Sequence, residues 1–376
     1  FHYDTLRDYY HKWYRPDLQG IIVVGDIDVD QIEAKIKSLF NDDSVPAGAP
    51  QRTYYTVPDN KEMIVYTQAD NEQPTLNFSL YMKHDAEPRQ SRATREAFLG
   101  SYKSRLAMFI LRQRLAQLSH EAQPRVMSAS CRAGSFYVTT EKDAFALNLG
   151  LMPNNPQAGI DAAIEIVEKA RRYGFTEAEL EHAKVQHTVN IEHRLDNKNK
   201  TRNAEYAKKI VSSFCGDEPC MNIEYEAALE AEFSATVTLD DINRTMKEMV
   251  DNQNQVCIVF GPTKYDGKPY TMPSADQFRT WIEKAQQREY TNDNTARQVD
   301  PTFIKKLPKK GKILSKHAAD NGYTEYLLSN GIKVSARQSD IEPNRLTINM
   351  FRLGGRSLYP DADAPTLQFL GSVVKE

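Results

Sequence analysis

The stretch that decides the fold begins with Thr75-Leu76-Asn77-Phe78-Ser79-Leu80-Tyr81-Met82 and extends to residue 151. In the opening run every second residue is apolar, which is typical of a strand with one face in a core and the other outside it. Residues 93–117 follow with apolar residues at three- and four-residue steps, and these predict a long helix. Three β-rich runs come next, at residues 127–131, 135–140 and 144–151, with turns expected at 132–134 and 141–143. Short strands joined by tight turns predict an antiparallel meander.

The residues before this stretch predict a helix, a strand and a second helix. Asp4 is placed to cap a helix over residues 5–13, which must end before Pro16. The β-branched run Ile21-Ile22-Val23-Val24 is typical of a central strand buried on both faces. Asp28 or Asp30 is placed to cap the second helix. Residues 42–60 then predict a loop with one edge strand, and residues 63–68 a further strand.

After Pro153 the sequence becomes helical. We predict helices near residues 160–167, 176–195, 200–214, 223–232 and 240–249, followed by a strand at 256–260. Thr176 and Glu179 form a capping-box pattern, and Asp240 or Thr238 is placed to cap the last of these helices. Strands and helices are segregated along the chain instead of alternating. We therefore predict the α+β class, as a two-layer unit with a mostly antiparallel sheet packed on helices.

These patterns divide the chain into three parts. Residues 1–262 form a first unit, residues 263–321 a connector with one helix at 275–287, and residues 322–376 the start of another unit. The last part predicts a hairpin around Asn330-Gly331, a third strand at 346–353 and a helix beginning at Ala364-Pro365. So small a sheet buries too little apolar area to be stable alone. Both ends of the sequence fall inside apolar-periodic patterns, so we expect a piece of a longer protein.

The composition excludes several classes of protein. Lys and Arg number 48 against 51 Asp and Glu, a net charge of −3, which argues against an electrostatic nucleic-acid binder. The basic run Lys305–Lys312 is therefore interpreted as a solvated linker and not as a nucleic-acid or membrane patch. A mean hydropathy of −0.61 and the lack of an apolar run near 18 residues exclude a transmembrane helix. With 17 Gly, 18 Pro and 4 Cys, collagen, low-complexity and disulfide-scaffold classes are excluded too.

The densest group of potential metal ligands is His182, His187, Glu192 and His193, all on the helix expected at 176–195. His187 and His193 are six residues apart, which at about 100° per residue puts them on different sides of a helix. His182 and His193 share a face but lie roughly three turns apart. Neither pair can bind one zinc ion, so we interpret these histidines as exposed or supporting side chains.

Other reactive residues also fail to form a site in the sequence. Cys215 and Cys220 bracket a loop with no second ligand pair nearby, which leaves either two reduced thiols or, in an exported protein, a local disulfide. Cys131 and Cys257 are expected on core strands. Ser119, His120 and Glu121 lack the spacing of a triad, and Gly354-Gly355 lacks the pattern of a phosphate loop. We therefore assign no catalytic, cofactor-binding or metal-binding residue.

Two motifs resemble the insulinase/pitrilysin family of zinc peptidases. The first is Leu6-Arg7-Asp8-Tyr9-Tyr10-His11-Lys12-Trp13-Tyr14-Arg15-Pro16 followed by Gly20-Ile21-Ile22-Val23-Val24-Gly25-Asp26-Ile27-Asp28. The second is Leu328-Ser329-Asn330-Gly331-Ile332-Lys333-Val334 with the later Gly354-Gly355-Arg356-Ser357. The resemblance covers most of the chain, although the helical middle matches in layout more than in motif.

The resemblance implies repeated α+β units that pair as clamshell halves around a chamber for peptides. It places a zinc site in the first unit, where His-x-x-Glu-His and a later Glu bind the metal and the motif Glu activates water. Residues 1–262 would then be the tail of that unit and the whole non-catalytic second repeat, and residues 322–376 would open the third. The expected helix at 364–370 contains no His or Glu, as in a degenerate copy. No metal ligand is carried over to this chain.

Two functions follow from the resemblance. The first, which we favour, is the non-catalytic, chamber-forming portion of a zinc metalloendopeptidase, whose zinc ligands lie outside this chain and which is inactive alone. The alternative is a non-catalytic scaffold or partner subunit of an insulinase-like peptidase complex. The implied partners are peptide substrates and the catalytic unit of the same chain, with a homodimer or a paired subunit left open. Bacterial relatives are often exported, which favours the cell envelope or periplasm.

Overall fold

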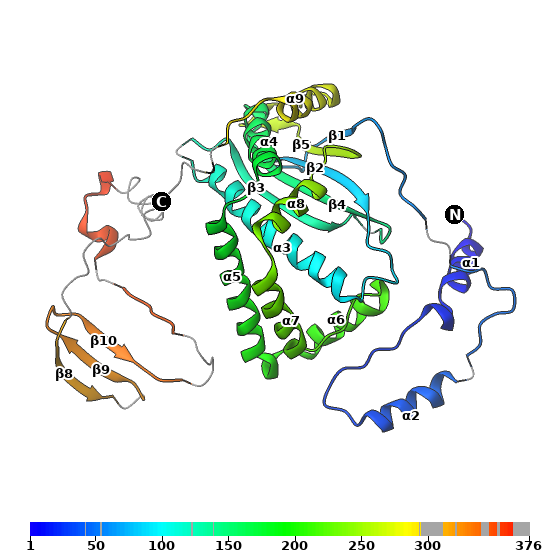
Figure 1. Cartoon of the computed structure of the whole chain (residues 1–376), viewed down its shortest axis with the longest axis horizontal. Helices are drawn as coiled ribbons and strands as arrows, with labels where there is room; N and C mark the ends of the chain where they lie inside the picture. The colour runs from blue at the N-terminus through cyan, green and yellow to red at the C-terminus, as the bar shows by residue number, and fades with distance from the viewer. Residues whose placement is uncertain are drawn as a thin grey trace. The chain divides into compact units, whose positions relative to one another are not determined.

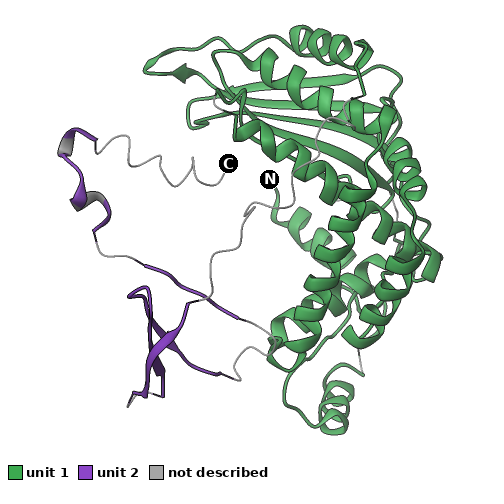
Figure 2. Ribbon diagram, turned by 60° about the vertical axis from the view of Figure 1, so that its left-hand side comes forward, with its two compact units in different colours: residues 1–294 green, residues 295–376 purple. Residues whose placement is uncertain are grey.

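The computed structural model describes residues 1–41, 43–52, 55–121, 123–137, 139–292, 294, 311–319, 322–339, 346–351 and 354–363. The chain forms two compact units, residues 1–294 and residues 295–376, which Figure 2 distinguishes by colour. Among the residues so described, no helix combines the length and hydrophobicity that crossing a bilayer requires.

The first unit is built on a five-stranded sheet in the order β1-β5-β2-β4-β3. The strands are β1 Ile64–Asp70, β2 Leu76–Asp85, β3 Val126–Ser135, β4 Lys142–Leu151 and β5 Gln255–Pro262. β1 and β5 run parallel, whereas β5 with β2, β2 with β4, and β4 with β3 are antiparallel. The mostly antiparallel sheet predicted from the sequence is therefore confirmed.

Helices pack against one face of this sheet (Figure 1). The helices whose side chains join the core are α3 Arg95–Ala116, α4 Pro156–Tyr173, α5 Glu177–Asp196, α7 Ile223–Thr236, α8 Leu239–Met249 and α9 Ala275–Gln287, whereas α6 Asn203–Gly216 has no buried residue. α3, α4 and α9 contact strands directly, while α5, α7 and α8 pack on α3. The core between the two layers contains the alternate residues Phe78 and Leu80 of β2, each 1% exposed. Burial of that apolar face is what the alternating sequence of β2 predicts, and the α+β class is confirmed.

Local capping signals set where several helices begin. The Thr176 hydroxyl accepts from the Glu179 backbone N–H while the Glu179 carboxylate accepts from Thr176, so the predicted capping box forms. Thr238, and not Asp240, caps α8. Asp28 caps the helix α2, Val29–Phe40, by accepting from the Gln31 N–H at 3.1 Å. Each cap supplies an acceptor for N–H groups that have no partner within the helix.

The N-terminal segment departs from the sequence prediction in two ways. Helix α1 spans Tyr3–Trp13, but its N-cap is His2, and Asp4 lies in the first turn, where it pairs with Arg7. The run 21–24 is not a strand, and Ile21 is 50% exposed. A strand needs a hydrogen-bonded neighbour, and within the described ranges no segment pairs with this run. The short helix η1, Pro16–Leu18, precedes it, and the described part of residues 42–60 contains no edge strand.

The meander also differs from the prediction, since it has two long strands in place of three short ones. Residues 132–134, expected as a turn, pair with residues 144–146 inside the β3–β4 ladder. The turn lies between Ser135 and Lys142 instead. The glycine at 134 suggested a turn. In the structure the pairing of β3 with β4 continues through Gly134, and Cys131 of β3 is buried. The strand pairing therefore outweighs the local preference of glycine for a turn.

Helix α9 enlarges the first unit beyond the boundary expected at residue 262. Phe278 and Ile282 of α9 are fully buried, and the Phe278 ring lies 6.4 Å from that of Phe78. Arg279 of the same helix donates to the carbonyl of Met63 at 3.2 Å. The helix sits in the core and not in a free connector, so the first unit extends to Asn294. A small hairpin, β6 Lys264–Tyr265 with β7 Lys268–Pro269, precedes it, and most of the basic run 305–312 lies outside the described residues.

The second unit is a three-stranded antiparallel sheet in the order β10-β9-β8. Its elements are β8 Ile313–Ala318, β9 Thr324–Leu328, β10 Lys333–Ala336 and the short helices η4 Gly355–Leu358 and η5 Asp361–Asp363. The predicted hairpin is confirmed, with Gly331 at a φ of 84° in its turn. The third strand is β8 and not residues 346–353, because the exposed run 346–351 has no strand pairing. The helix expected from Ala364 lies outside the described residues.

We expect deletion of residues 295–376 to leave the thermal transition of the first unit within about 2 °C of its original value, since its core closes within residues 1–294. Circular dichroism melts of the two chains measure this. As a positive control, Phe278→Ala in the same chain should lower stability by about 3–5 kcal/mol. A fall on deletion as large as that of the control would contradict the expected independence.

Candidate functional site

The helix-free side of the five-stranded sheet, here called the open face, is the candidate functional surface. In β2, residues 77, 79, 81 and 83 alternate with the core residues and lie on this side. The register places Ser79 beside Asn148 and Ile258, and Tyr81 beside Ala146 and Val256. An apolar group on this side consists of buried Tyr81, Ala144 and Ala146, with partly buried Phe136, Val256 and Ile258 packed against them. Over the described ranges, no helix contributes to it.

The open face has an apolar half and a small-residue half. On β1 and β5, Ile64, Tyr66 and Phe260 are 50%, 50% and 42% exposed, and the Tyr66 and Phe260 rings lie 6.2 Å apart. Across β2, β4 and β3 the side chains are small and mostly polar: Ser79, Asn148, Ser130, Ser128 and Gly150. The Ser79 hydroxyl donates to the Asn148 amide oxygen at 2.9 Å. An extended polypeptide can bind to such a surface, because the apolar half offers contacts for its side chains and the short polar side chains of the other half leave room for its backbone.

An aromatic corner, formed by Tyr81, Arg132, Phe136 and Tyr137, lies where the open face meets the β3–β4 turn. The Tyr81 ring is 5.4 Å from each of the Phe136 and Tyr137 rings. The Arg132 guanidinium lies 6.0 Å from the centre of the Tyr81 ring. Tyr137 has a φ of 54°, and burial together with its hydrogen bond to Tyr81 raises the pKa of its hydroxyl to about 12. The Tyr137 hydroxyl is therefore neutral at physiological pH.

Two lysines, Lys83 and Lys142, lie at the same end of the sheet and make hydrogen bonds to neighbouring segments. Burial lowers the pKa of Lys83, whose Nζ donates to the carbonyl of Pro58 at 2.8 Å. Lys142 donates to Asp59 at 2.8 Å and to Asp85 at 2.6 Å, and these hydrogen bonds raise its pKa. The two ammonium groups are thus engaged in tying the segment before β1 to β2 and β4.

The histidines singled out in the sequence lie on α5, on the helical side of the unit. His182, Glu192 and His193 are exposed. His187 packs between the rings of Tyr102 and Phe109, at 5.8 and 6.4 Å. Burial, with Arg105 and Arg112 nearby, lowers the pKa of His187. Among the described residues, no group of three His, Cys, Asp or Glu is placed to hold a metal ion, so those residues do not fit a zinc site.

The cysteines divide as the sequence predicted. Cys131 and Cys257 are buried on β3 and β5, and burial raises the pKa of Cys131 to about 12. Cys215 and Cys220 are exposed and not bonded to each other. The Ser213 hydroxyl donates to Glu218 at 2.6 Å, so the chain folds back along that side of α6.

The remaining candidates make local interactions. The Ser119 hydroxyl donates to the carbonyl of Ala116 at 2.8 Å, and Glu121 pairs with Arg125, so neither is coupled to His120. Gly354 and Gly355 have φ angles of 119° and 52° and lie at the start of η4.

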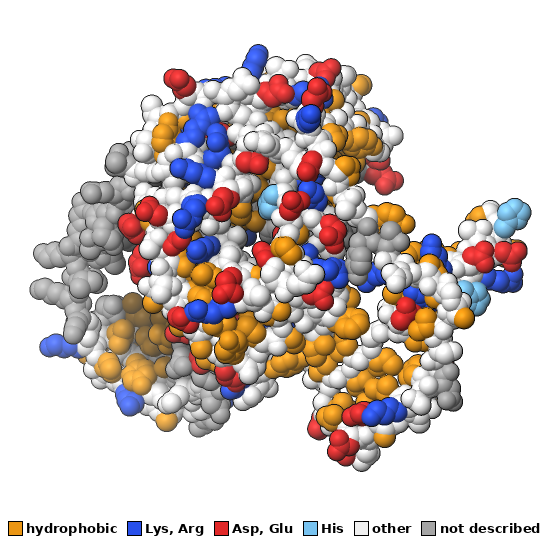
Figure 3. All heavy atoms as spheres, turned by 45° about the vertical axis from the view of Figure 1, so that its right-hand side comes forward, with side chains coloured by type: hydrophobic (Ala, Val, Ile, Leu, Met, Phe, Trp, Pro, Cys, Tyr) orange, Lys and Arg blue, Asp and Glu red, His pale blue; other side chains and the backbone are white. Residues whose placement is uncertain are grey.

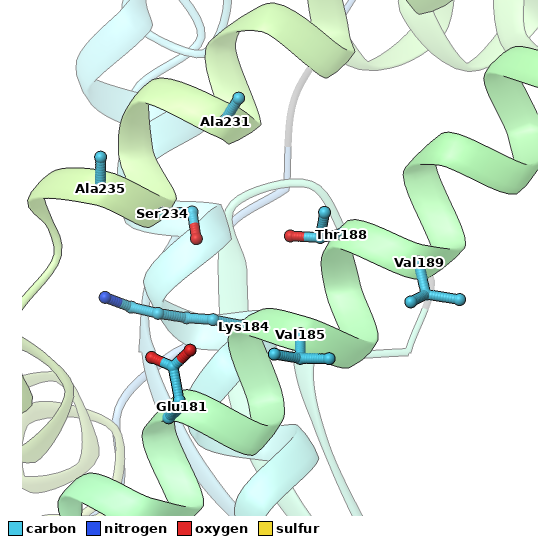
Figure 4. A pocket seen from close by; sticks show the side chains of 8 residues that line it. All are labelled: Glu181, Lys184, Val185, Thr188, Val189, Ala231, Ser234 and Ala235. Carbon is cyan, nitrogen blue, oxygen red and sulfur yellow. The ribbon is translucent and has the colours of Figure 1, made fainter.

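The helical side has a hollow of about 390 Å³ between α5 and α7 (Figure 4). Its Lys184 donates to the carbonyl of Val237 at 2.7 Å, just beyond the C-terminus of α7. On the face of the molecule that Figure 3 shows, acidic and basic side chains are interspersed, in line with the net charge of −3.

Sequence reasoning missed the aromatic corner because it placed residues 132–134 in a turn. As part of β3, Arg132 lies directly beside Ala146, which lies beside Tyr81. The signal was present in the sequence, where Ser128, Ser130 and Arg132 alternate with Ala129, Cys131 and Ala133 and so carry the period of a strand into the expected turn.

Comparison with known proteins shows what the chain is similar to. Residues 1–186 match the family model described as the peptidase M16 inactive domain. The probable zinc protease PqqL of Haemophilus influenzae is 22% identical over 379 residues, which cover 99% of this chain and 39% of that protein. The chain therefore spans about two fifths of this relative's length.

Solved structures share the fold. The periplasmic protease PqqL from Escherichia coli superposes with a TM-score of 0.65 at 17% identity, over 90% of this chain and 37% of that chain. The separate structure of the first half of the same protease gives a TM-score of 0.63 at 16% identity, over 77% of this chain and 60% of that chain. The likeness extends over most of this chain and shows a common fold.

We expect the stability of the protein to fall below pH 6.5 in part through His187. Its pKa in the folded protein is lowered from 6.5, so below that pH the unfolded chain binds a proton that the folded chain does not. His187→Phe should therefore lose less stability than the original protein between pH 7.5 and pH 5.5 in urea unfolding. His193→Phe, at an exposed position of the same helix, is the control; equal losses in all three proteins would show that His187 does not contribute.

Proposed function

Because the chain is homologous to the insulinase-like M16 zinc proteases and carries their inactive domain over residues 1–186, we propose that it forms the non-catalytic wall of the peptide chamber of a zinc metalloendopeptidase. The open face is the observation that carries this proposal. A sheet covered by helices on one side leaves its other side for substrate, with apolar side chains on β1 and β5 and small ones across β2, β4 and β3. In this proposal the helices form the outer layer of the wall.

The proposal places the zinc ligands outside this chain. Within the described residues no cluster of side chains suits the metal, whereas the curated relative is called a zinc protease. Bound in the full-length protein, zinc would supply an activated water for peptide hydrolysis. This chain would contribute surface for the substrate and no group to the reaction.

The N-terminal segment supports its assignment as the tail of a preceding unit. On α1, Tyr3, Leu6, Tyr9 and Tyr10 are 77%, 55%, 60% and 56% exposed. Because so much apolar and aromatic side-chain surface is exposed on one short helix, we infer that another part of the protein covers it. A preceding α+β unit would cover it and would also supply the hydrogen-bonded neighbours that residues 21–24 need to become a strand. On the same reasoning, residues 322–376 open the next unit.

We also propose a location in the cell envelope. The support is the relative from Escherichia coli, which is described as a periplasmic protease.

The proposal that the open face contacts substrate can be tested in the full-length protein by placing a bulky side chain on this face and measuring peptide cleavage. Ser130 is exposed on β3, where tryptophan fits the strand. Ser130→Trp should lower kcat/KM for peptide cleavage about tenfold, with zinc content unchanged, because it obstructs the surface and not the metal. Asn190→Trp, exposed on α5, is the control on the helical side. Equal activity of both variants would refute the wall. Full-length protein that has no His-x-x-Glu-His and no chelator-sensitive cleavage would support the scaffold alternative instead.

The chain by itself should neither cleave peptides nor bind zinc tightly at a one-to-one ratio, because the residues that the structure describes contain no set of zinc ligands. Isothermal titration with zinc, followed by a peptide-library assay, measures both. Stoichiometric zinc accompanied by cleavage would overturn the assignment of the ligands to another part of the protein.

A further inference from the structure

The aromatic corner contains a cation without an acidic partner. Arg132 is exposed on β3, and its guanidinium donates to the carbonyl of Ser135 at 3.3 Å. No ion pair forms between Arg132 and any carboxylate of the described residues. An arginine held in place but not neutralised is suited to a carboxylate brought by a ligand.

The register of the sheet explains how Arg132 is held. It lies beside Ala146 of β4, and Ala146 lies beside Tyr81 of β2. Because alanine is small, the arginine side chain can reach across β4 until its guanidinium lies over the Tyr81 ring, 6.0 Å from its centre. The guanidinium is therefore pre-positioned over the open face, and less conformational freedom is lost when it binds.

Neighbouring charges do not compete for the same ligand. The Nζ of Lys83 is buried and donates to Pro58, and Lys142 is paired with Asp59 and Asp85. Asp143, nearest on β4, pairs in register with Ser135 and His84 and so falls on the opposite face from Ala144 and Ala146. Among the described residues of this corner, Arg132 is the cation that remains available.

Tyr137 supplies an apolar surface next to this charge. Its φ of 54° is unusual for a residue other than glycine, and such conformations persist only where surrounding contacts hold them. Here the ring packs 4.9 Å from Phe136 and 5.4 Å from Tyr81, yet the residue stays 53% exposed. An exposed ring beside an arginine suits a carboxylate adjacent to an apolar side chain.

We propose that the aromatic corner selects extended peptides with an acidic residue next to an apolar one, with the carboxylate on Arg132 and the apolar side chain on Tyr137. This inference rests on the proposed function, because it gives the substrate preference of the same open face. The segment recognised is acidic, so the preference weakens as salt screens the charge.

The test measures binding of two fluorescent decapeptides to the full chain at low salt by anisotropy. One peptide contains Glu-Phe at its centre, and its twin contains Lys-Phe. We expect the acidic peptide to bind about three- to tenfold more tightly than the twin, because a single partly exposed ion pair contributes only a modest binding free energy. Arg132→Gln should abolish the preference, and Arg132→Lys should retain part of it. Arg202→Gln, at an arginine on the helical side, should leave the preference unchanged, and unchanged thermal melts should show that each variant is folded.

A second variant, at Tyr137, distinguishes the contribution of the aromatic ring from that of the Arg132 charge. Tyr137→Ala should weaken both peptides by a similar factor, because the ring contacts the apolar side chain they share. Equal affinity for the acidic peptide and its twin, a preference that survives Arg132→Gln, or no binding of either peptide overturns the inference. The wall itself is judged separately, by Ser130→Trp in the cleavage assay of the full-length protein.

Discussion

The contact on which this structure depends is the packing of one face of β2 and β4 against α3, α4 and α9. Phe78 and Leu80 of β2 and Phe145 and Leu147 of β4 are at most 1% exposed in that layer. Each such side chain contributes about 1.5–3 kcal/mol relative to an exposed position. Because strand side chains alternate, burial of this face determines which residues lie on the other one. A shift of one residue in register would exchange core and open face.

The open face follows from that constraint, and its chemistry comes from the residues between the buried ones. On β3 and β4 the side chains of the open face are small, while Tyr81, Phe136 and Tyr137 lie together at the β3–β4 turn. The strained backbone of Tyr137 belongs to this arrangement, since its ring packs on Phe136 and Tyr81. The chamber wall that we propose needs one face built for stability and one left for substrate, and a sheet with helices on a single side meets both requirements.

The ends of the chain illustrate the limit of local signals. Residues 21–24 have the composition of a buried strand, yet without a paired neighbour they remain extended and partly exposed. The run 346–351 behaves in the same way in the second unit, where β8 takes the place next to β9. In both cases the side chains carry the pattern of a sheet, but hydrogen bonding to another strand decides whether the sheet forms.

From the sequence alone, periodicity, caps and turn residues determined the helices α3 to α9, the capping box of Thr176, the hairpin at Asn330-Gly331 and the α+β class, because these depend on contacts a few residues apart. For α2 and α8 the sequence offered two caps each, and the structure chose Asp28 and Thr238. The motifs near Tyr9 and Gly25 also indicated the family. Only the tertiary structure decided that residues 132–134 continue β3, that α9 belongs to the core, and that Arg132, Tyr81 and Tyr137 meet. These features depend on strand register and on packing between segments far apart in sequence, and no local pattern encodes which distant segments pair.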